Sequence, residues 1–299
     1  MMRDLNGKVA FITGGGSGIG FGIATCAAQA GMKVALADVR ADHLEQALAK
    51  LRAAGAQAHG MLVDVADAAA VERAAEETVR VFDKVHLVCN NAGVSIFGPM
   101  DVATMDDWRW IMGVNVDGVI NGIQAFIPRL KAHGEGGHIV NTASMAGLLV
   151  GPGMGLYSAS KFAVVGLTTS LRYDLAPHGI GVSVLCPGFV RSNIHEAVKT
   201  RPKHLAQTGY PVSEEEMKRL DGVLSVGMDP VEVGAHVIAG VRENRQYIFP
   251  HAEFREELRA VMDELLAALP DRPPEPARMA VEDWRRLRKA EAAKLVKNF

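Results

Sequence analysis

Short apolar segments alternate with longer helical stretches along most of this sequence. The apolar segments span residues 8–13, 33–38, 59–64, 85–90, 138–143, 182–186 and 246–249, and helices are predicted over 42–54, 106–131 and 157–176. The segments carry apolar side chains on both faces, which is typical of parallel strands covered by helices on either side. Because connections between parallel strands are right-handed, the pattern predicts an α/β fold with a doubly wound sheet.

The size and charge of the chain exclude several classes of protein. With 299 residues, of which 48% are apolar, the chain is long enough for one large α/β domain. The net charge is −2, so there is no basic excess to bind nucleic acid or an anionic membrane. No apolar run reaches about 20 residues, so we expect neither a membrane span nor secretion.

The cysteines and histidines indicate a reducing compartment and no metal. Cys26, Cys89 and Cys186 each lie within an apolar stretch, which favours buried, reduced thiols and a cytoplasmic location. The 10 histidines show no spacing typical of a metal site, so no bound metal is expected.

A glycine-rich loop, residues 13–20, follows the first predicted strand and precedes a helix. Gly14 permits a sharp turn, Gly18 lets the backbone approach a ligand, and Gly20 lets the helix pack against the strand. The helix N-terminus adds free N–H groups and the positive end of a dipole. The loop therefore predicts a binding site for the pyrophosphate of a dinucleotide.

Asp38 ends the second predicted strand, where a carboxylate accepts hydrogen bonds from the ribose hydroxyls of adenosine. The same charge repels a 2′-phosphate by roughly 4 kcal/mol at a separation of about 4 Å, so NAD is favoured over NADP. Arg40 is the opposing signal because an arginine at this place holds a 2′-phosphate. The alternative is that the Arg40 side chain points to solvent.

Asp64 and Val65 end the third predicted strand, and Asp64 has two interpretations. Its carboxylate could bind the adenine amino group, or it could cap the helix after Val65, since aspartate is a preferred N-cap. The sequence leaves both open.

Tyr157, Lys161 and Ser144 are the candidate catalytic residues. Tyr157 and Lys161 are four residues apart on a predicted helix and share a face. Free tyrosine has a pKa near 10, and a neighbouring ammonium would lower it toward the range useful for proton transfer. Ser144 follows a strand and could bind the substrate oxygen. The set predicts hydride transfer to or from a nicotinamide, with Tyr157 handling the proton.

With these residues in this order, the chain resembles the short-chain dehydrogenase/reductase family from about Leu5 to Pro250. The resemblance implies a Rossmann-type sheet of seven strands, a homo-dimer or homo-tetramer built on the helices near Asp106 and Tyr157, and a catalytic set of Asn115, Ser144, Tyr157 and Lys161. It also implies that Asn115 kinks its helix. The cofactor residues that it implies are Gly14, Ser17, Gly18, Ile19, Gly20, Asp38, Asp64, Val65, Asn91, Ala92, Gly93, Tyr157, Lys161, Pro187 and Gly188. The threonine usual after Pro187-Gly188 is replaced by Ser192 or Asn193.

The predicted domain of residues 1–250 contains a substrate lid at about 189–228. Its apolar composition favours a bulky, hydrophobic or aryl secondary alcohol. In residues 21–22, 115–122, 192–194 and 247–250, and in the long helical tail that follows, the chain resembles bacterial Cα-dehydrogenases. The resemblance implies oxidation of the benzylic alcohol of lignin-derived aryl ethers. The expected substrate residues are Ser95, Met145, Met154, Phe189 and Ile194. The alternatives are an NADP-preferring carbonyl reductase of the same family and a non-catalytic redox sensor.

Residues 251–299 are predicted to form a helical extension. Seven apolar residues fall at helical spacing, which predicts a stripe that packs on the sheet domain or on a neighbouring subunit; they are Phe254, Leu258, Val261, Met262, Leu265, Leu266 and Leu269. A proline-rich connector at 270–276 precedes a second helix that carries Trp284.

Overall fold

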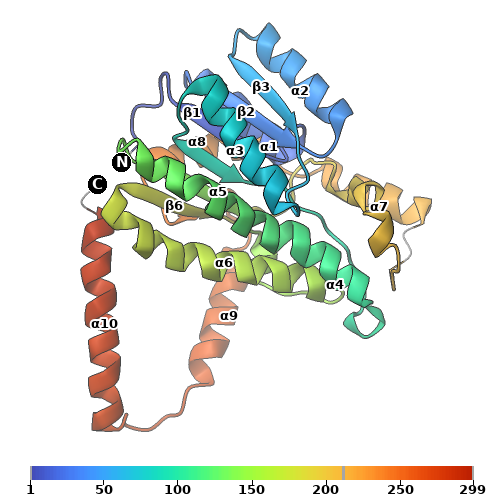
Figure 1. Ribbon diagram of the computed structural model, residues 1–299. Helices are drawn as coiled ribbons and strands as arrows, with labels where there is room; N and C mark the ends of the chain where they lie inside the picture. The colour runs from blue at the N-terminus through green and yellow to red at the C-terminus, as the bar shows by residue number, and fades with distance from the viewer. Residues whose placement is uncertain (1, 211–212, 298–299) are drawn as a thin grey trace.

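The computed structural model describes residues 2–210 and 213–297. Its centre is a sheet of seven strands in the order β3-β2-β1-β4-β5-β6-β7. All neighbouring strands are parallel, so the predicted doubly wound α/β fold is confirmed (Figure 1). The strands are β1 (Val9–Thr13), β2 (Lys33–Asp38), β3 (Ala58–Leu62), β4 (Leu87–Asn90), β5 (Gly137–Thr142), β6 (Ile180–Leu185) and β7 (Tyr247–Ile248).

Helices cover both faces of the sheet. Ala10 and Ile12 of β1 share an apolar cluster with α1 (Gly18–Gln29), α2 (Ala41–Ala53) and α8 (Pro230–Arg242). Phe11, which lies between them, belongs to a second cluster with α3 (Ala68–Phe82) and α5 (Gly118–Ala132). Successive side chains of a strand point to opposite faces, so the two clusters are the two sides of the core.

The helix predicted over 106–131 is formed in three parts: α4 (Met105–Met112), a π-helical segment (Gly113–Asp117) and α5. Thr104 and Asp107 form a capping box that fixes the start of α4. A π-helical turn contains an extra residue and often marks a functional site. Asn115 lies in this segment, as the family resemblance implies.

The chain after β7 forms two helices that leave the body of the molecule. Figure 1 shows α9 (Arg255–Ala267) and α10 (Pro276–Lys297) running away from the sheet and back, so that the end of α10 lies beside the body. The predicted stripe packs on the sheet domain only in its first half, through Phe254, Leu258 and Val261. Its second half is exposed. Among the described helices, none has both the length and the apolar character needed to cross a membrane.

Candidate active site

A cavity of about 1290 Å³ lies where the phosphate loop, the carboxyl ends of β2 to β6 and the lid meet. All the site residues predicted from the sequence line this cavity, with the exceptions of Gly20 and Asn115. In open α/β sheets, ligands bind outside the carboxyl ends of the strands. The cavity is therefore the candidate active site.

The loop after β1 has the shape required to bind a phosphate through its backbone. Gly14 and Gly18 have positive φ angles of 62° and 49°, which other residues rarely adopt. A Cβ on Gly20 would lie 2.0 Å from the carbonyl oxygen of Gly14, which explains why this glycine contacts the loop rather than the cavity. The Ser17 side chain makes no capping bond to the α1 N-terminus, so the loop fits a pyrophosphate bound by N–H groups.

Thr13 braces this loop against the neighbouring strand. Its Oγ1 accepts hydrogen bonds from the backbone N–H groups of Asn91 at 2.9 Å and Ala92 at 3.0 Å. The Asn91 amide donates in turn to the Thr13 carbonyl at 3.1 Å. Of the two candidates after Pro187-Gly188, Ser192 is the one over the phosphate loop, because a Cβ on Gly18 would lie 2.9 Å from Ser192 Cβ.

The adenosine end of the cavity is defined by Asp38 and Arg40. Asp38 accepts hydrogen bonds from the backbone N–H groups of Gly16 and Arg40, both at 2.9 Å. The Arg40 guanidinium pairs with Asp42 at 2.5 Å and lies 3.6 Å from Glu196 of the lid. The interpretation that Arg40 points freely to solvent is therefore wrong. Its bond to Asp42 raises the pKa of Arg40 and lowers that of Asp42.

Asp64 is not the cap of α3. The cap is Asp67, whose Oδ1 accepts from the N–H groups of Ala69 at 2.9 Å and Ala70 at 3.2 Å. The Asp64 carboxylate accepts from the Ala66 N–H at 2.9 Å, and Asp64 lines the cavity together with Val65. The cap interpretation was wrong because α3 begins three residues later than the strand end suggested.

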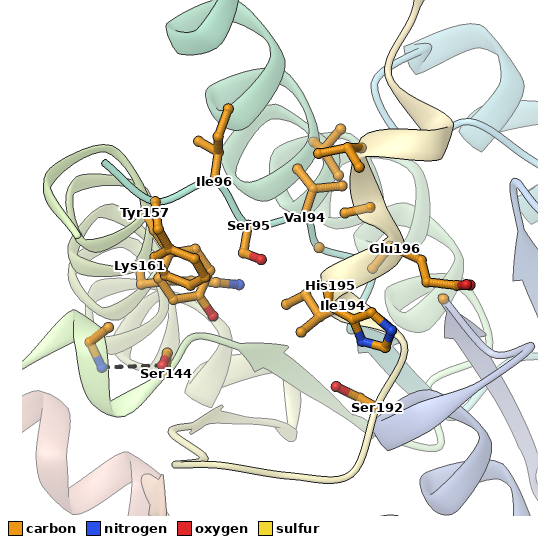
Figure 2. Close-up of a pocket in the computed structure, with 18 of the residues that line it drawn as sticks. Val94, Ser95, Ile96, Ser144, Tyr157, Lys161, Ser192, Ile194, His195 and Glu196 are labelled. Atoms are coloured by element: carbon orange, nitrogen blue, oxygen red, sulfur yellow. Dashed lines mark hydrogen bonds between the residues drawn. The ribbon is translucent and has the colours of Figure 1, made fainter. Parts of the chain in front are cut away.

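Ser144, Tyr157 and Lys161 converge on one side of the cavity. Figure 2 shows them facing the lid residues Ser192 and Ile194 across the open space. Ser144 follows β5, and its hydroxyl accepts a hydrogen bond from the Ala146 N–H at 3.1 Å. Tyr157 and Lys161 come from α6 (Gly155–Leu175). The Lys161 ammonium donates to the Thr142 carbonyl at 3.1 Å and lies 5.5 Å from the centre of the Tyr157 ring.

Burial dominates the ionisation of this set. It raises the pKa of the Tyr157 phenol, and the hydrogen bond with Ser144 lowers it only in part. It also lowers the pKa of Lys161 to about 8. Removal from water disfavours the charged forms of both groups, so burial opposes the lowering of the Tyr157 pKa that a neighbouring ammonium would give.

Asn115 supports the site from behind the cavity wall. It is fully buried. Its side-chain oxygen accepts from the Val94 N–H at 2.8 Å, and its amide donates to the Val94 carbonyl and to Ser160 Oγ, both at 3.0 Å. Ser160 precedes Lys161 on α6, so Asn115 joins the π-helical segment to the helix that carries the candidate catalytic residues.

The substrate end of the cavity is mainly apolar. The five residues expected to contact the substrate all line the cavity: Ser95, Met145, Met154, Phe189 and Ile194. The sequence did not reveal that Phe97, Trp110 and Phe254 also line it. Phe97 packs edge-on against the Tyr157 ring with 5.8 Å between centroids. Only the aromatic character of these residues could have indicated this role, since their places along the chain are far apart.

The lid, residues 189–228, is closed at its base and anchored at its middle. Arg191 N–H donates to the Met228 carbonyl at 3.1 Å, and Met228 N–H to the Phe189 carbonyl at 3.0 Å. Arg201 donates to Asp107 of α4 at 2.6 Å. Burial raises the pKa of Asp107, but bonds from the Thr104 and Gly209 backbones and from Arg201 outweigh it and hold the pKa at about 2.

One group of side chains has the composition of a metal site, far from the cavity. His86, His133 and Glu135 lie close together. His86 Nδ1 accepts from the Val9 N–H at 3.2 Å, and His133 Nδ1 accepts from the Glu135 N–H at 3.1 Å. Glu135 also pairs with Lys8 at 2.7 Å and with Lys84 at 2.6 Å. These bonds explain the cluster without an ion, and the absence of a metal stays a prediction.

The sequence from residue 8 to residue 203 matches the family model of the short chain dehydrogenases. The chain belongs to that family. The predicted resemblance is thereby confirmed, and the protein is an oxidoreductase of a family that binds NAD(H) or NADP(H) and acts on the CH–OH group of its substrates.

Close relatives extend over the lid and the C-terminal helices. The C alpha-dehydrogenase of Sphingobium sp. strain SYK-6 is 43% identical over 286 residues, which cover 94% of this chain and 93% of the relative. LigO of the same strain, in its apo form, has a TM-score of 0.79 at 41% identity, over 95% of this chain and 98% of LigO. A short chain dehydrogenase/reductase of Burkholderia phymatum, solved with NAD, has a TM-score of 0.84 at 40% identity, over 92% and 100% of the two chains.

Proposed function

We propose that this protein is an NAD-dependent dehydrogenase that interconverts a bulky, hydrophobic or aryl secondary alcohol and its ketone. The observation that carries the proposal is the single cavity that joins Tyr157 and Ser144 at one end to Asp38 at the other. NAD would supply the acceptor for the hydride of the alcohol carbon. The residues of the chain would bind and orient the alcohol and move its proton.

In this proposal, Tyr157 takes the hydroxyl proton during oxidation and returns it during reduction. Ser144 lies beside Tyr157 and would hold the substrate oxygen through its hydroxyl. Lys161, buried next to the phenol ring, would stabilise the phenolate once it has formed. Its lowered pKa of about 8 means that this ammonium loses its charge in mildly alkaline solution, close to the range in which tyrosine is needed as a base.

The preference for NAD is argued from the charges at the adenosine end. Asp38 is nearly buried and faces the cavity, so a 2′-phosphate would lie beside its carboxylate. Arg40 would be the group to compensate, but Asp42 and Glu196 already pair with it. A phosphate would have to displace these carboxylates. This argument favours NAD over the alternative of an NADP-preferring carbonyl reductase.

The substrate class rests on the cavity wall and on one relative. Phe97, Phe189, Met145 and Met154 give the nicotinamide end a flexible, apolar lining. The relative at 43% identity is named a C alpha-dehydrogenase. We infer that an aryl group of the substrate packs against these side chains, and that the product is an aryl ketone.

A panel of alcohols tests the proposal. Aryl secondary alcohols with NAD should give a higher kcat/KM than ethanol, glucose or lactate, followed through the absorbance of NADH. A clear preference for small polar alcohols would contradict the substrate class. Activity with NADP equal to that with NAD would contradict the cofactor assignment and leave the family assignment intact.

We propose that residues 1–250 form the catalytic domain with the lid at 189–228, that residues 251–299 form a separate helical extension, and that the protein is a homo-dimer or homo-tetramer. Sedimentation of the purified chain measures its assembly directly.

A further inference from the structure

The C-terminal helices form an arm, defined here as residues 255–297, with a long exposed apolar surface. Eight large apolar side chains of the arm are 43–67% exposed: Met262, Leu265 and Leu266 of α9, Leu269 just after it, and Val281, Trp284, Leu287 and Leu295 of α10. Large apolar side chains exposed along both helices in this way mark an interaction site.

Within the part of the chain that the structure describes, the arm is fixed to the body at its two ends. At its start, Leu258 and Val261 pack on the apolar cluster around α6. At its far end, Val296 is buried and its carbonyl accepts from the Asn244 amide at 3.3 Å. Between these points, α9 and α10 do not pack on each other over the described residues, and Figure 1 shows them held apart. The apolar stripe of α9 thus continues from the core onto an unpartnered helix.

The two helices carry opposite charge. α9 has four acidic and two basic residues, whereas α10 has seven basic and three acidic residues. Asp263 and Glu264 of α9, and Lys289 and Lys294 of α10, have no ion-pair partner within the described parts of the chain. In a twofold dimer, if α9 of one copy contacts α10 of the other, then α10 of the first copy also contacts α9 of the second. An acidic α9 would therefore face a basic α10 twice.

We propose that the arm is an interaction surface for a second copy of this chain, with α9 of one copy against α10 of the other. At 1.5 Å per residue, helices of 13 and 22 residues extend for about 20 and 33 Å. That length is sufficient for a standard interface of roughly 800 Å² per partner. The apolar side chains would form its centre and the unpaired charges its rim.

The arm also begins at the active-site cavity. Phe254, which directly precedes α9, and Glu257 of its first turn line the same cavity as Tyr157. Pairing of the arms would hold α9 from its outer end and so fix this part of the cavity wall.

Sedimentation equilibrium tests the pairing. The unmodified chain, of 32.0 kDa, should sediment as a dimer or a multiple of it, and the double variant Leu266→Glu/Leu287→Glu should have half that mass. Leu62→Glu is the matched control, because Leu62 is as exposed as the two arm leucines, each at 64%, but lies on β3. A monomeric unmodified chain, or a double variant of unchanged mass, would overturn the proposal. Unchanged circular dichroism shows that the variants are folded.

Cross-linking distinguishes arm pairing from other contacts between copies. All three native cysteines are buried, so Leu266→Cys/Leu287→Cys adds the only two exposed thiols. Mild oxidation should give a covalent dimer in high yield, whereas Leu62→Cys should not. Absence of this cross-link would show that the arms of two copies do not contact each other. If the unmodified chain stays monomeric and floats with anionic phosphatidylserine vesicles, the arm binds a membrane surface instead.

Discussion

Arg201 donates to the carboxylate of Asp107 at 2.6 Å across the boundary between the lid and α4, and both side chains are nearly or fully removed from solvent, at 10% and 0% exposure. The guanidinium also lies over the Trp110 ring, 5.1 Å from its centre. This pair ties the middle of the lid to the sheet domain. The lid is thus anchored well away from its base, where Phe189 and Arg191 bond to Met228.

Loss of this anchor should destabilise the protein and loosen substrate binding. Removing one partner of a buried ion pair leaves the other charge unpaired, at a cost of about 3–5 kcal/mol. Arg201→Met should therefore lower the free energy of unfolding in urea by about 3 kcal/mol and raise the KM for the alcohol. Arg201→Lys keeps the charge and serves as the control. A change below about 0.5 kcal/mol would show that the anchor is unimportant.

Tyr157→Phe should abolish most of the activity without preventing cofactor binding. The substitution removes only the hydroxyl that accepts the proton, and loss of such a group commonly lowers kcat by about 10²–10⁴-fold. Fluorescence titration should show an NADH dissociation constant close to that of the unmodified enzyme. If the variant keeps more than about a tenth of the original kcat, another group accepts the proton.

Asp38→Asn should reduce the preference for NAD. The change removes the charge but keeps an oxygen for the Gly16 N–H, so the loop should remain in place. In the unmodified enzyme, we expect kcat/KM to be at least about 10-fold higher with NAD than with NADP, which requires only part of the charge repulsion between Asp38 and a 2′-phosphate. In the variant, this ratio should fall. Arg40→Met is the companion variant: it should weaken NADP further and leave NAD unaffected. An unmodified enzyme that prefers NADP contradicts this assignment.

The stability of the protein should fall in mild acid because of His138. Burial, with a contribution from the charge of Arg172, lowers the pKa of this histidine to about 3. An unfolded chain takes up the proton near pH 6.5, so stability is lost progressively as the pH falls from about 6.5 to 3. Between pH 7 and 5, this group alone should remove about 2 kcal/mol.

His138→Gln provides the comparison, since glutamine does not titrate and still reaches toward Ser183, which bonds His138 at 2.8 Å. Its free energy of unfolding should change less with pH than that of the unmodified chain. If the free energy of unfolding changes with pH equally in the two proteins, His138 does not cause the loss of stability in acid.

The sequence was sufficient for the parts of the site that are local in the chain. Gly14, Gly18 and Gly20 lie close together in the sequence at the spacing that the phosphate loop requires. Tyr157 and Lys161 lie on one face of a single helix. Their chemistry is therefore visible in short stretches of sequence. The sheet was predictable for the same reason, because its central strands are short, continuous apolar runs that are buried on both faces.

The features that the sequence missed depend on partners from distant segments or on burial. Arg40 was misjudged because one of its partners, Glu196, comes from the lid. The pKa of Tyr157 is raised by burial, and the extent of that burial depends on segments that are distant in the chain. Arg201 and Asp107 are 94 positions apart, and nothing in their local sequence links them.

The position of β1 between β2 and β4 affects how the protein is made. During synthesis, β1, β2 and β3 leave the ribosome before β4 and β5, whereas a domain generally folds as a unit. The hydrogen bonds between Thr13 and Asn91 that hold the loop after β1 can form only when Asn91 has emerged. The opposite wall of the cavity is synthesised still later, because its residues follow β5. Added NAD should therefore not stabilise a nascent chain released at about residue 130, whereas it should stabilise full-length chains that are still folding.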